Sequence, residues 1–84
     1  MKLYTLDNQF IKETKTLPSN YTGMIEYPSG RKDWLKASLY HRLDGPAIEW
    51  AVINKKEYWV DGKQYMEEQH ALLVDIMKLK GLTL

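Results

Sequence analysis

Residues 41–63 decide the fold, and they read HRLDGPAIEWAVINKKEYWVDGK. Asp44-Gly45-Pro46 and Asp61-Gly62 are turn signals within this stretch, because glycine reaches positive φ at no steric cost and proline fixes the direction of the chain. Residues 47–52 and 56–61 are rich in β-branched and aromatic side chains, which favours strands. The stretch therefore predicts short strands joined by tight turns.

The chain before this stretch predicts two further hairpins. Asp7-Asn8-Gln9 and Pro28-Ser29-Gly30 are typical of hairpin turns, and Pro18-Ser19-Asn20 separates the two units. The strands expected here are residues 2–7, 10–17, 21–27, 31–37 and 39–42. Residues 63–65 are expected to form one more short strand or the lead-in to the next element.

The central part of the chain contains an internal repeat. Three positions recur in order at offsets of 23, 25 and 25 residues: Glu26 with Glu49, Trp34 with Trp59, and Tyr40 with Tyr65. One such unit cannot bury its apolar face alone. We therefore expect the two copies to stack side by side, with Trp34 and Trp59 in the core on one face of a sheet.

Residues 66–80 predict a C-terminal helix, because the apolar period changes there from about 2 to about 3.6 residues. Acidic residues stand in its first turn, basic residues in its last, and Gly81 follows as a C-cap. The apolar stripe expected to face the sheet is Leu72, Leu73, Ile76 and Met77. His70 is expected at the surface beside Glu67, and Leu82-Thr83-Leu84 is expected to pack on the sheet or on a second subunit.

These segments predict one α+β domain over residues 1–84. It consists of an N-terminal hairpin (1–20), the two-copy aromatic repeat (21–65) and the helix (66–80). The sheet is expected to be an antiparallel meander of about five or six strands, covered on one face by the helix. Exposed sheet edges and surplus apolar residues also predict a homodimer.

Composition narrows the classes of function. Twelve Lys and Arg oppose 11 Asp and Glu, so no overall field attracts the protein to nucleic acid or to an anionic membrane. The absence of cysteine excludes disulfides and thiolate metal sites and favours the cytoplasm, or the host cytoplasm if the protein is phage-encoded. No stretch reaches the roughly 20 apolar residues of a membrane span, and no signal-peptide core is present, so we expect the whole chain to be the mature protein.

The motif in residues 41–49, His-Arg-Leu-Asp-Gly-Pro-Ala-Ile-Glu, followed by residues 57–63, resembles the short β-hairpin repeats of large-phage and giant-virus proteins. These repeats are loosely similar to MORN-like repeats, and the resemblance covers roughly residues 24–65. The second copy departs from the pattern, since Tyr65-Met66 stands where His-Arg would recur. The resemblance implies a phage-like origin and a binding or scaffolding role without catalytic residues.

Eight residues are candidates for contact with a partner or with RNA: Arg31, Lys32, His41, Arg42, Trp50, Lys55, Lys56 and Tyr58. His41-Arg42 stands at the entrance of a turn and could present an imidazole and a guanidinium to an anion. The alternative is that Arg42 pairs with Asp44 or Glu49 to hold the repeat together. The other six combine aromatic rings with basic loops, as RNA-binding surfaces do. The alternatives are that these are ordinary solvated charges and that Trp50 belongs to the core.

The sequence contains no ordered nucleophile, base and acid, no phosphate-binding loop and no paired carboxylates that would indicate an enzyme. We therefore expect neither catalysis nor a bound cofactor or metal. The leading hypothesis is a small phage-type inhibitor or adaptor that binds a host protein stoichiometrically, for example a defence or toxin component. The alternatives are an RNA-binding protein and a structural repeat module.

Overall fold

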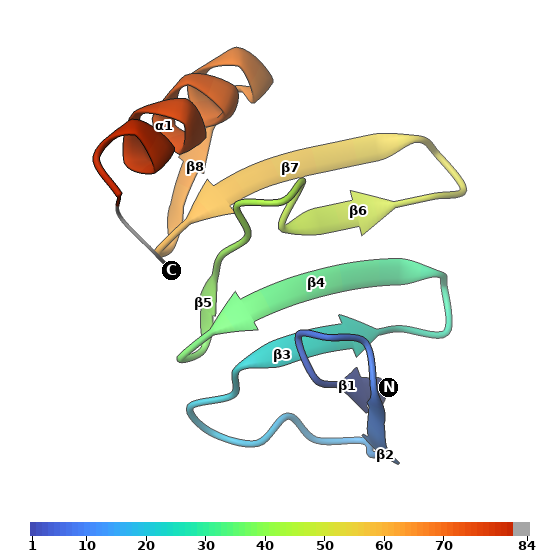
Figure 1. Ribbon diagram of the computed structural model, residues 1–84. Coiled ribbons are helices and arrows are strands. Elements are labelled where there is room, and N and C mark those ends of the chain that lie inside the picture. Colours follow the sequence, from blue (N-terminus) through green and yellow to red (C-terminus); the bar gives the residue numbers. More distant parts are fainter. Residues whose placement is uncertain (82–84) are drawn as a thin grey trace.

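The computed structural model describes residues 1–81 as an antiparallel sheet followed by one helix (Figure 1). The predicted packing of Leu82-Thr83-Leu84 lies outside the described residues. The strands are β1 (Lys2–Tyr4), β2 (Phe10–Glu13), β3 (Gly23–Glu26), β4 (Arg31–Lys36), β5 (Leu39–Tyr40), β6 (Ile48–Trp50), β7 (Lys55–Val60) and β8 (Lys63–Tyr65), and the helix is α1 (Glu67–Leu79).

The strand order is β2-β1-β3-β4-β6-β7-β8, and β5 also pairs with β4. The predicted α+β class is confirmed, but the sheet has eight strands where about five or six were expected. All eight strand-like segments of the sequence join the hydrogen-bonded ladder, including the short strands β5 and β8, whereas the expected count assumed that fewer of them would pair. The order is not a simple meander, since β1 lies between β2 and β3.

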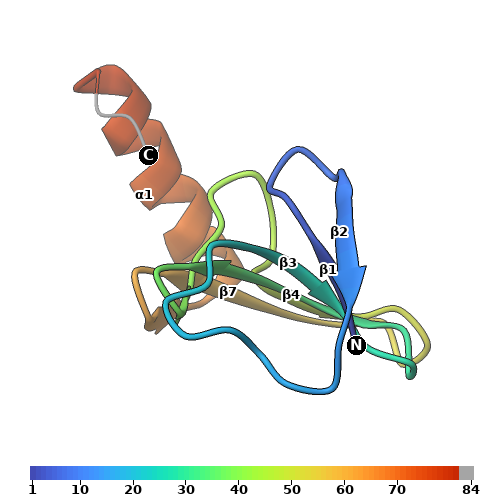
Figure 2. The same cartoon turned by 90° about the horizontal axis from the view of Figure 1, so that it is seen from below.

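Strands β5 and β6 are two pieces of one interrupted strand between β4 and β7. Both run antiparallel to β4, and the Trp34 backbone joins them: its N–H donates to the Ala47 carbonyl at 2.7 Å, and its carbonyl accepts from the His41 N–H at 3.0 Å. Residues 41–47, hereafter the motif loop, therefore leave the sheet opposite Trp34 of β4 and rejoin it opposite the same residue. Figure 2 shows the motif loop, the β1–β2 hairpin and α1 rising from the same side of the sheet.

The core lies on the opposite side of the sheet. Leu3 of β1, Ile25 of β3, Leu35 of β4 and Tyr21 form its buried cluster. The segment between β2 and β3 covers this side (Figure 2), and the Tyr21 hydroxyl donates to the Tyr4 carbonyl at 2.7 Å. Burial of these apolar side chains, worth roughly 1.5–3 kcal/mol each, fixes which strands become neighbours.

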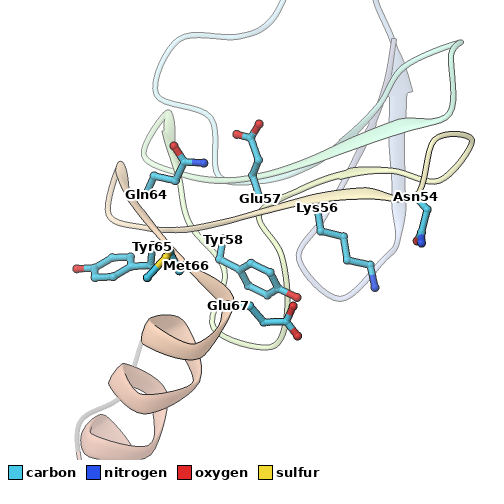
Figure 3. Close-up of a pocket in the computed structure, with 8 residues that line it drawn as sticks. All are labelled: Asn54, Lys56, Glu57, Tyr58, Gln64, Tyr65, Met66 and Glu67. Carbon is cyan, nitrogen blue, oxygen red and sulfur yellow. The ribbon is translucent and has the colours of Figure 1, made fainter.

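Side chains alternate along each strand, so neighbouring rows of the sheet point to opposite faces. The row that contains Leu3 and Ile25 defines the core face. Tyr58 packs against His70 of α1 with ring centroids 4.9 Å apart, so its side of the sheet is the helix face. In Figure 3, Tyr58 and Lys56 lie on the helix side of β7, whereas Glu57 points away from it.

One row of the helix face alternates in charge across six strands. The cross-strand partners follow the order Glu13, Lys2, Glu26, Lys32, Glu49 and Lys56. Opposite charges on directly opposed residues stabilise strand pairing by roughly 0.2–1 kcal/mol per pair. This charge row therefore favours the observed register.

The prediction that Trp34 and Trp59 share one face of the core is wrong. Both side chains are only half-buried. Arg31 and Lys55 both pair with Trp50. Arg31 and Lys55 therefore point to the same face of the sheet. Trp59 follows Lys55 by four residues, an even number, so its ring points to that face too. Trp34 follows Arg31 by three residues, an odd number, so its ring points to the opposite face. Trp59 lies on the core face with Glu57, to which its indole N–H donates at 3.0 Å.

Helix α1 is confirmed close to its predicted ends. The side-chain carbonyl of Gln69 accepts from the Met66 N–H at 3.1 Å at the start, and Gly81, with φ +68°, donates to the Lys78 carbonyl at 3.1 Å after the end. The helix packs mainly on β7 and leaves most of the sheet face uncovered. The predicted contact stripe is half wrong, because Leu72 and Ile76 are exposed.

Candidate functional site

The motif loop holds the Arg42 guanidinium in a fixed plane. The guanidinium carbon lies 3.9 Å from the centroid of the Trp34 ring, and Nη1 donates to the Pro46 carbonyl at 3.2 Å. Gly45 lies close to the guanidinium as well, since a Cβ built at position 45 would lie 3.3 Å from the guanidinium carbon. The Asp-Gly-Pro sequence therefore serves to clamp one arginine against one tryptophan.

Arg42 does not form the ion pair that would tie the repeat together. Within residues 1–81, neither Asp44 nor Glu49 pairs with it. Its backbone instead links the motif loop to β7 and to α1. The Arg42 N–H donates to the Trp59 carbonyl at 3.0 Å, and the Arg42 carbonyl accepts from His70 Nε2 at 2.8 Å. The stacking on Trp34 and these backbone bonds replace the predicted carboxylate contact.

Both histidines are buried at the base of the motif loop. His41 Nδ1 accepts from the Asp61 N–H at 2.9 Å and lies 3.2 Å from Asp61 Oδ1. Its proton is therefore on Nε2, which has no hydrogen-bond partner in the described part of the chain. The prediction that His70 is a surface residue is wrong, because the helix turns it onto Tyr58 and the Arg42 carbonyl.

Burial lowers the pKa of His41, and the nearby cation of Lys36 and the His70 ring lower it further, while the Asp61 carboxylate opposes them. The folded protein therefore binds fewer protons at this site than the unfolded chain. The stability that neutral His41 provides is complete above the ordinary pKa of 6.5 and is lost as the pH falls through the lowered folded value.

We expect the urea midpoint of unfolding to fall as the pH is lowered from 7.5 toward 5, because His41 must then be protonated in a buried place. In His41→Asn the amide oxygen keeps an acceptor for the Asp61 N–H but cannot titrate, so the midpoint should depend less on pH over this window. An equally steep profile in His41→Asn would assign the effect to another group.

A second cluster lies on the core face at the hairpin ends of β3, β4, β6 and β7. Arg31 lies over the Trp50 ring at 4.8 Å, and Lys55 lies 4.9 Å from the same ring. Arg31 is neutralised by Asp33, with Nε–Oδ1 at 2.7 Å and Nη2–Oδ2 at 3.0 Å. Of the predicted contact residues, the structure brings Arg31, Trp50 and Lys55 together here.

The remaining predicted contact residues lie elsewhere. Lys32 and Lys56 belong to the charge row of the helix face, where each is opposed by Glu49. Tyr58 lies beside Glu67 at the start of α1 (Figure 3), and burial together with that carboxylate raises its pKa. The eight candidates are therefore spread over the motif loop, the surroundings of Trp50 and the helix face, and no single basic and aromatic surface contains them all.

A third surface, which the sequence did not single out, joins α1 to the edge strand β8. Leu72 and Leu79 are 61% and 87% exposed, and Met66 and Ile76 are also exposed. A cavity of about 300 Å³ lies between the helix and the strand, lined by Lys63, Gln64, Tyr65, Gln69, Leu72, Leu73 and Ile76. In the described sheet β8 pairs only with β7, so its outer backbone edge is open. We call this the α1–β8 surface.

Among residues 1–81, no group of three or more His, Asp or Glu side chains is placed to hold a metal ion. None of the helices in this part of the chain has the length and apolar character needed to cross a membrane. Comparison with protein families, curated proteins and solved structures finds no match to this chain.

Proposed function

We propose that this protein is a non-enzymatic binding protein that acts as an inhibitor or adaptor by forming a stoichiometric complex with another protein. The α1–β8 surface carries the proposal. The residues Leu72, Ile76 and Leu79 are spaced at i, i+4 and i+7, so they form one exposed apolar stripe. Contiguous apolar patches on small proteins mark interaction sites.

The open edge of β8 indicates the form of the partner. An unpaired edge accepts an additional strand, whose backbone supplies the hydrogen bonds while its alternate side chains supply specificity. The apolar stripe of α1 lies beside this edge, next to the cavity bounded by Tyr65 and Leu73. An extended partner segment with apolar side chains fits both features. The resemblance of residues 24–65 to phage hairpin repeats favours a host protein as the source of that segment.

RNA binding remains the second candidate, and the Trp50 cluster is the observation that favours it. Trp50 lies between Arg31 and Lys55 at cation–π distances on an otherwise mixed surface. Aromatic rings next to cations are a common platform for single-stranded nucleic acid. The salt bridge to Asp33 and the proximity of Lys55 to Glu57 reduce the positive charge available there, so we rank this function below protein binding.

We expect the Leu72→Glu/Leu79→Lys variant to lose capture of a partner from host-cell lysate by roughly tenfold or more, because two charges then replace the most exposed part of the apolar stripe. The measurement is a pull-down with and without nuclease, quantified against the wild-type protein. The matched control is Val52→Glu/Ile53→Lys, which changes two residues that are 85% and 65% exposed in the β6–β7 turn.

The control should capture the same partner as the wild-type protein does. Capture that nuclease abolishes and that Lys55→Ala/Lys56→Ala weakens would contradict the protein-binding proposal and support RNA binding, and the latter should then decline steeply with salt. Equal loss in both double variants would also contradict the assignment to the α1–β8 surface.

A further inference from the structure

The helix face contains a cavity of about 360 Å³ between the tip of the β1–β2 hairpin and the motif loop. Its lining combines apolar with charged groups: Leu6, Thr22, Trp34, Leu35, Lys36, His41, Arg42, Leu43 and Asp44. We call it the Trp34 cavity. It is separate from the α1–β8 surface, and its assignment does not rest on the proposed function.

Arg42 is prepared for an anion in this cavity. Its guanidinium is held between Trp34 and Gly45, and of its five N–H donors only Nη1 has a hydrogen-bond partner in residues 1–81, the Pro46 carbonyl. A planar guanidinium matches the two oxygens of a carboxylate or a phosphate. Because the clamp already fixes the side chain, binding costs little further conformational entropy.

His41 also belongs to the lining, but its Nε2 is buried and is not exposed to the cavity. Its side chain is 7% exposed, and its Nε2–H has no partner in the described residues. Buried polar groups in native structures are nearly always hydrogen-bonded, so this unpartnered group is an unusual feature next to the cavity, and the binding argument rests on Arg42.

The charges and the apolar walls select the class of ligand. Arg42 supplies a positive charge with no carboxylate partner in residues 1–81, whereas the Lys36 ammonium lies 3.8 Å from the Asp61 carboxylate and Asp44 adds a negative charge. This balance suits a monoanion better than a doubly charged phosphate. Leu6, Trp34 and Leu43 form apolar walls that fit an aliphatic group. We propose that the Trp34 cavity binds a carboxylate carried on a compact apolar group, such as an apolar residue with a free carboxylate.

The test is an NMR titration of the full chain with N-acetyl-leucine, which follows the indole N–H signal of Trp34 and the Nε–H signal of Arg42. We expect saturable shifts of both signals in the millimolar range. N-acetyl-leucinamide, which has the same apolar group without the carboxylate, should bind roughly tenfold or more weakly. Equal binding of the amide, or saturable binding of inorganic phosphate at the same concentrations, would overturn the assignment.

Two variants keep the test independent of folding. Arg42→Lys retains the charge but not the planar fork, and should abolish the saturable shift. Leu6→Glu places a negative charge at an exposed position of the cavity lining, leaves the clamp intact and should weaken N-acetyl-leucine by roughly tenfold. Unchanged binding in the folded Leu6→Glu protein would also overturn the proposal.

A peptide Gly-Gly-Gly-Leu with a free carboxylate distinguishes the source of the ligand. Tighter binding than that of N-acetyl-leucine identifies a polypeptide terminus, and equal binding identifies a small carboxylic acid. Both results support the carboxylate site, whereas weaker binding of the peptide than of its C-terminal amide would contradict it.

Discussion

Replacing Arg31 with methionine is expected to lower the free energy of unfolding by about 3 kcal/mol, because it leaves the Asp33 carboxylate buried without its cation. Asp33 is 1% exposed, and Arg31 donates to both of its oxygens. The value lies at the lower end for a broken buried pair, since the Arg31 side chain is itself 29% exposed and water can reach the gap. Urea denaturation at neutral pH measures the change.

Lys55→Met is the matched control for Arg31→Met. It removes the other cation beside Trp50, but the carboxylate near Lys55 belongs to Glu57 at 3.8 Å in a more exposed pair. Its expected cost is below about 1 kcal/mol. The double variant Arg31→Met/Asp33→Leu should be more stable than Arg31→Met alone, because no buried charge remains. A cost for Arg31→Met as small as that of the control would show that Asp33 is solvated.

The Gly23→Ala variant is expected to lose about 3 kcal/mol of stability, through strain and through loss of a buried hydrogen bond. Gly23 has φ +150°, and a Cβ there would clash with the Tyr4 carbonyl oxygen and lie 2.6 Å from the Tyr21 hydroxyl. Tyr21 donates to that same carbonyl, so the added methyl group separates two groups that join β1 to the core. Thermal and urea unfolding measure the loss.

Gly30→Ala separates the two causes. Gly30 has φ +88° in the β3–β4 turn, and a Cβ there meets no atom within 4 Å. Its replacement should therefore cost only the backbone penalty of about 1 kcal/mol. Tyr21→Phe, which removes the hydroxyl and keeps the ring, should also cost about 1 kcal/mol. If Gly23→Ala were no worse than Gly30→Ala, the close approach at Gly23 would carry no energetic weight.

The hairpins could be predicted from the sequence because their signals are local. Asp61-Gly62 forms the predicted turn with φ values of +49° and +79°, and Ala37-Ser38 forms the matching turn of the first copy without glycine. The position of β1 between β2 and β3 could not be predicted in this way. It depends on Leu3 meeting Ile25 across 22 residues, a long-range contact that no local pattern encodes.

The residue types in the sequence indicated which side chains could form the candidate sites, but the sequence analysis did not identify which residues contact one another there. Arg31 and Asp33 are two residues apart on a strand and so share a face, a signal that could have revealed the buried ion pair. His70 falls on the same helical arc as Leu73 and Met77, which could have indicated its burial. The stacking of Arg42 on Trp34 requires the motif loop to fold over β4, which is a different strand from the one that leads into the loop, and spacing alone does not show this.

The charge row of the helix face has a kinetic consequence for a partner that approaches that face. Its charges alternate in sign from one strand to the next, so their fields cancel within a few strand spacings of about 4.8 Å. Little potential then remains beyond the Debye length of about 8 Å at physiological ionic strength. A partner that approaches this row therefore does so without electrostatic guidance, at the roughly 10⁵–10⁶ M⁻¹s⁻¹ of neutral surfaces and with little dependence on salt. Long-lived complexes must then owe their affinity to slow dissociation.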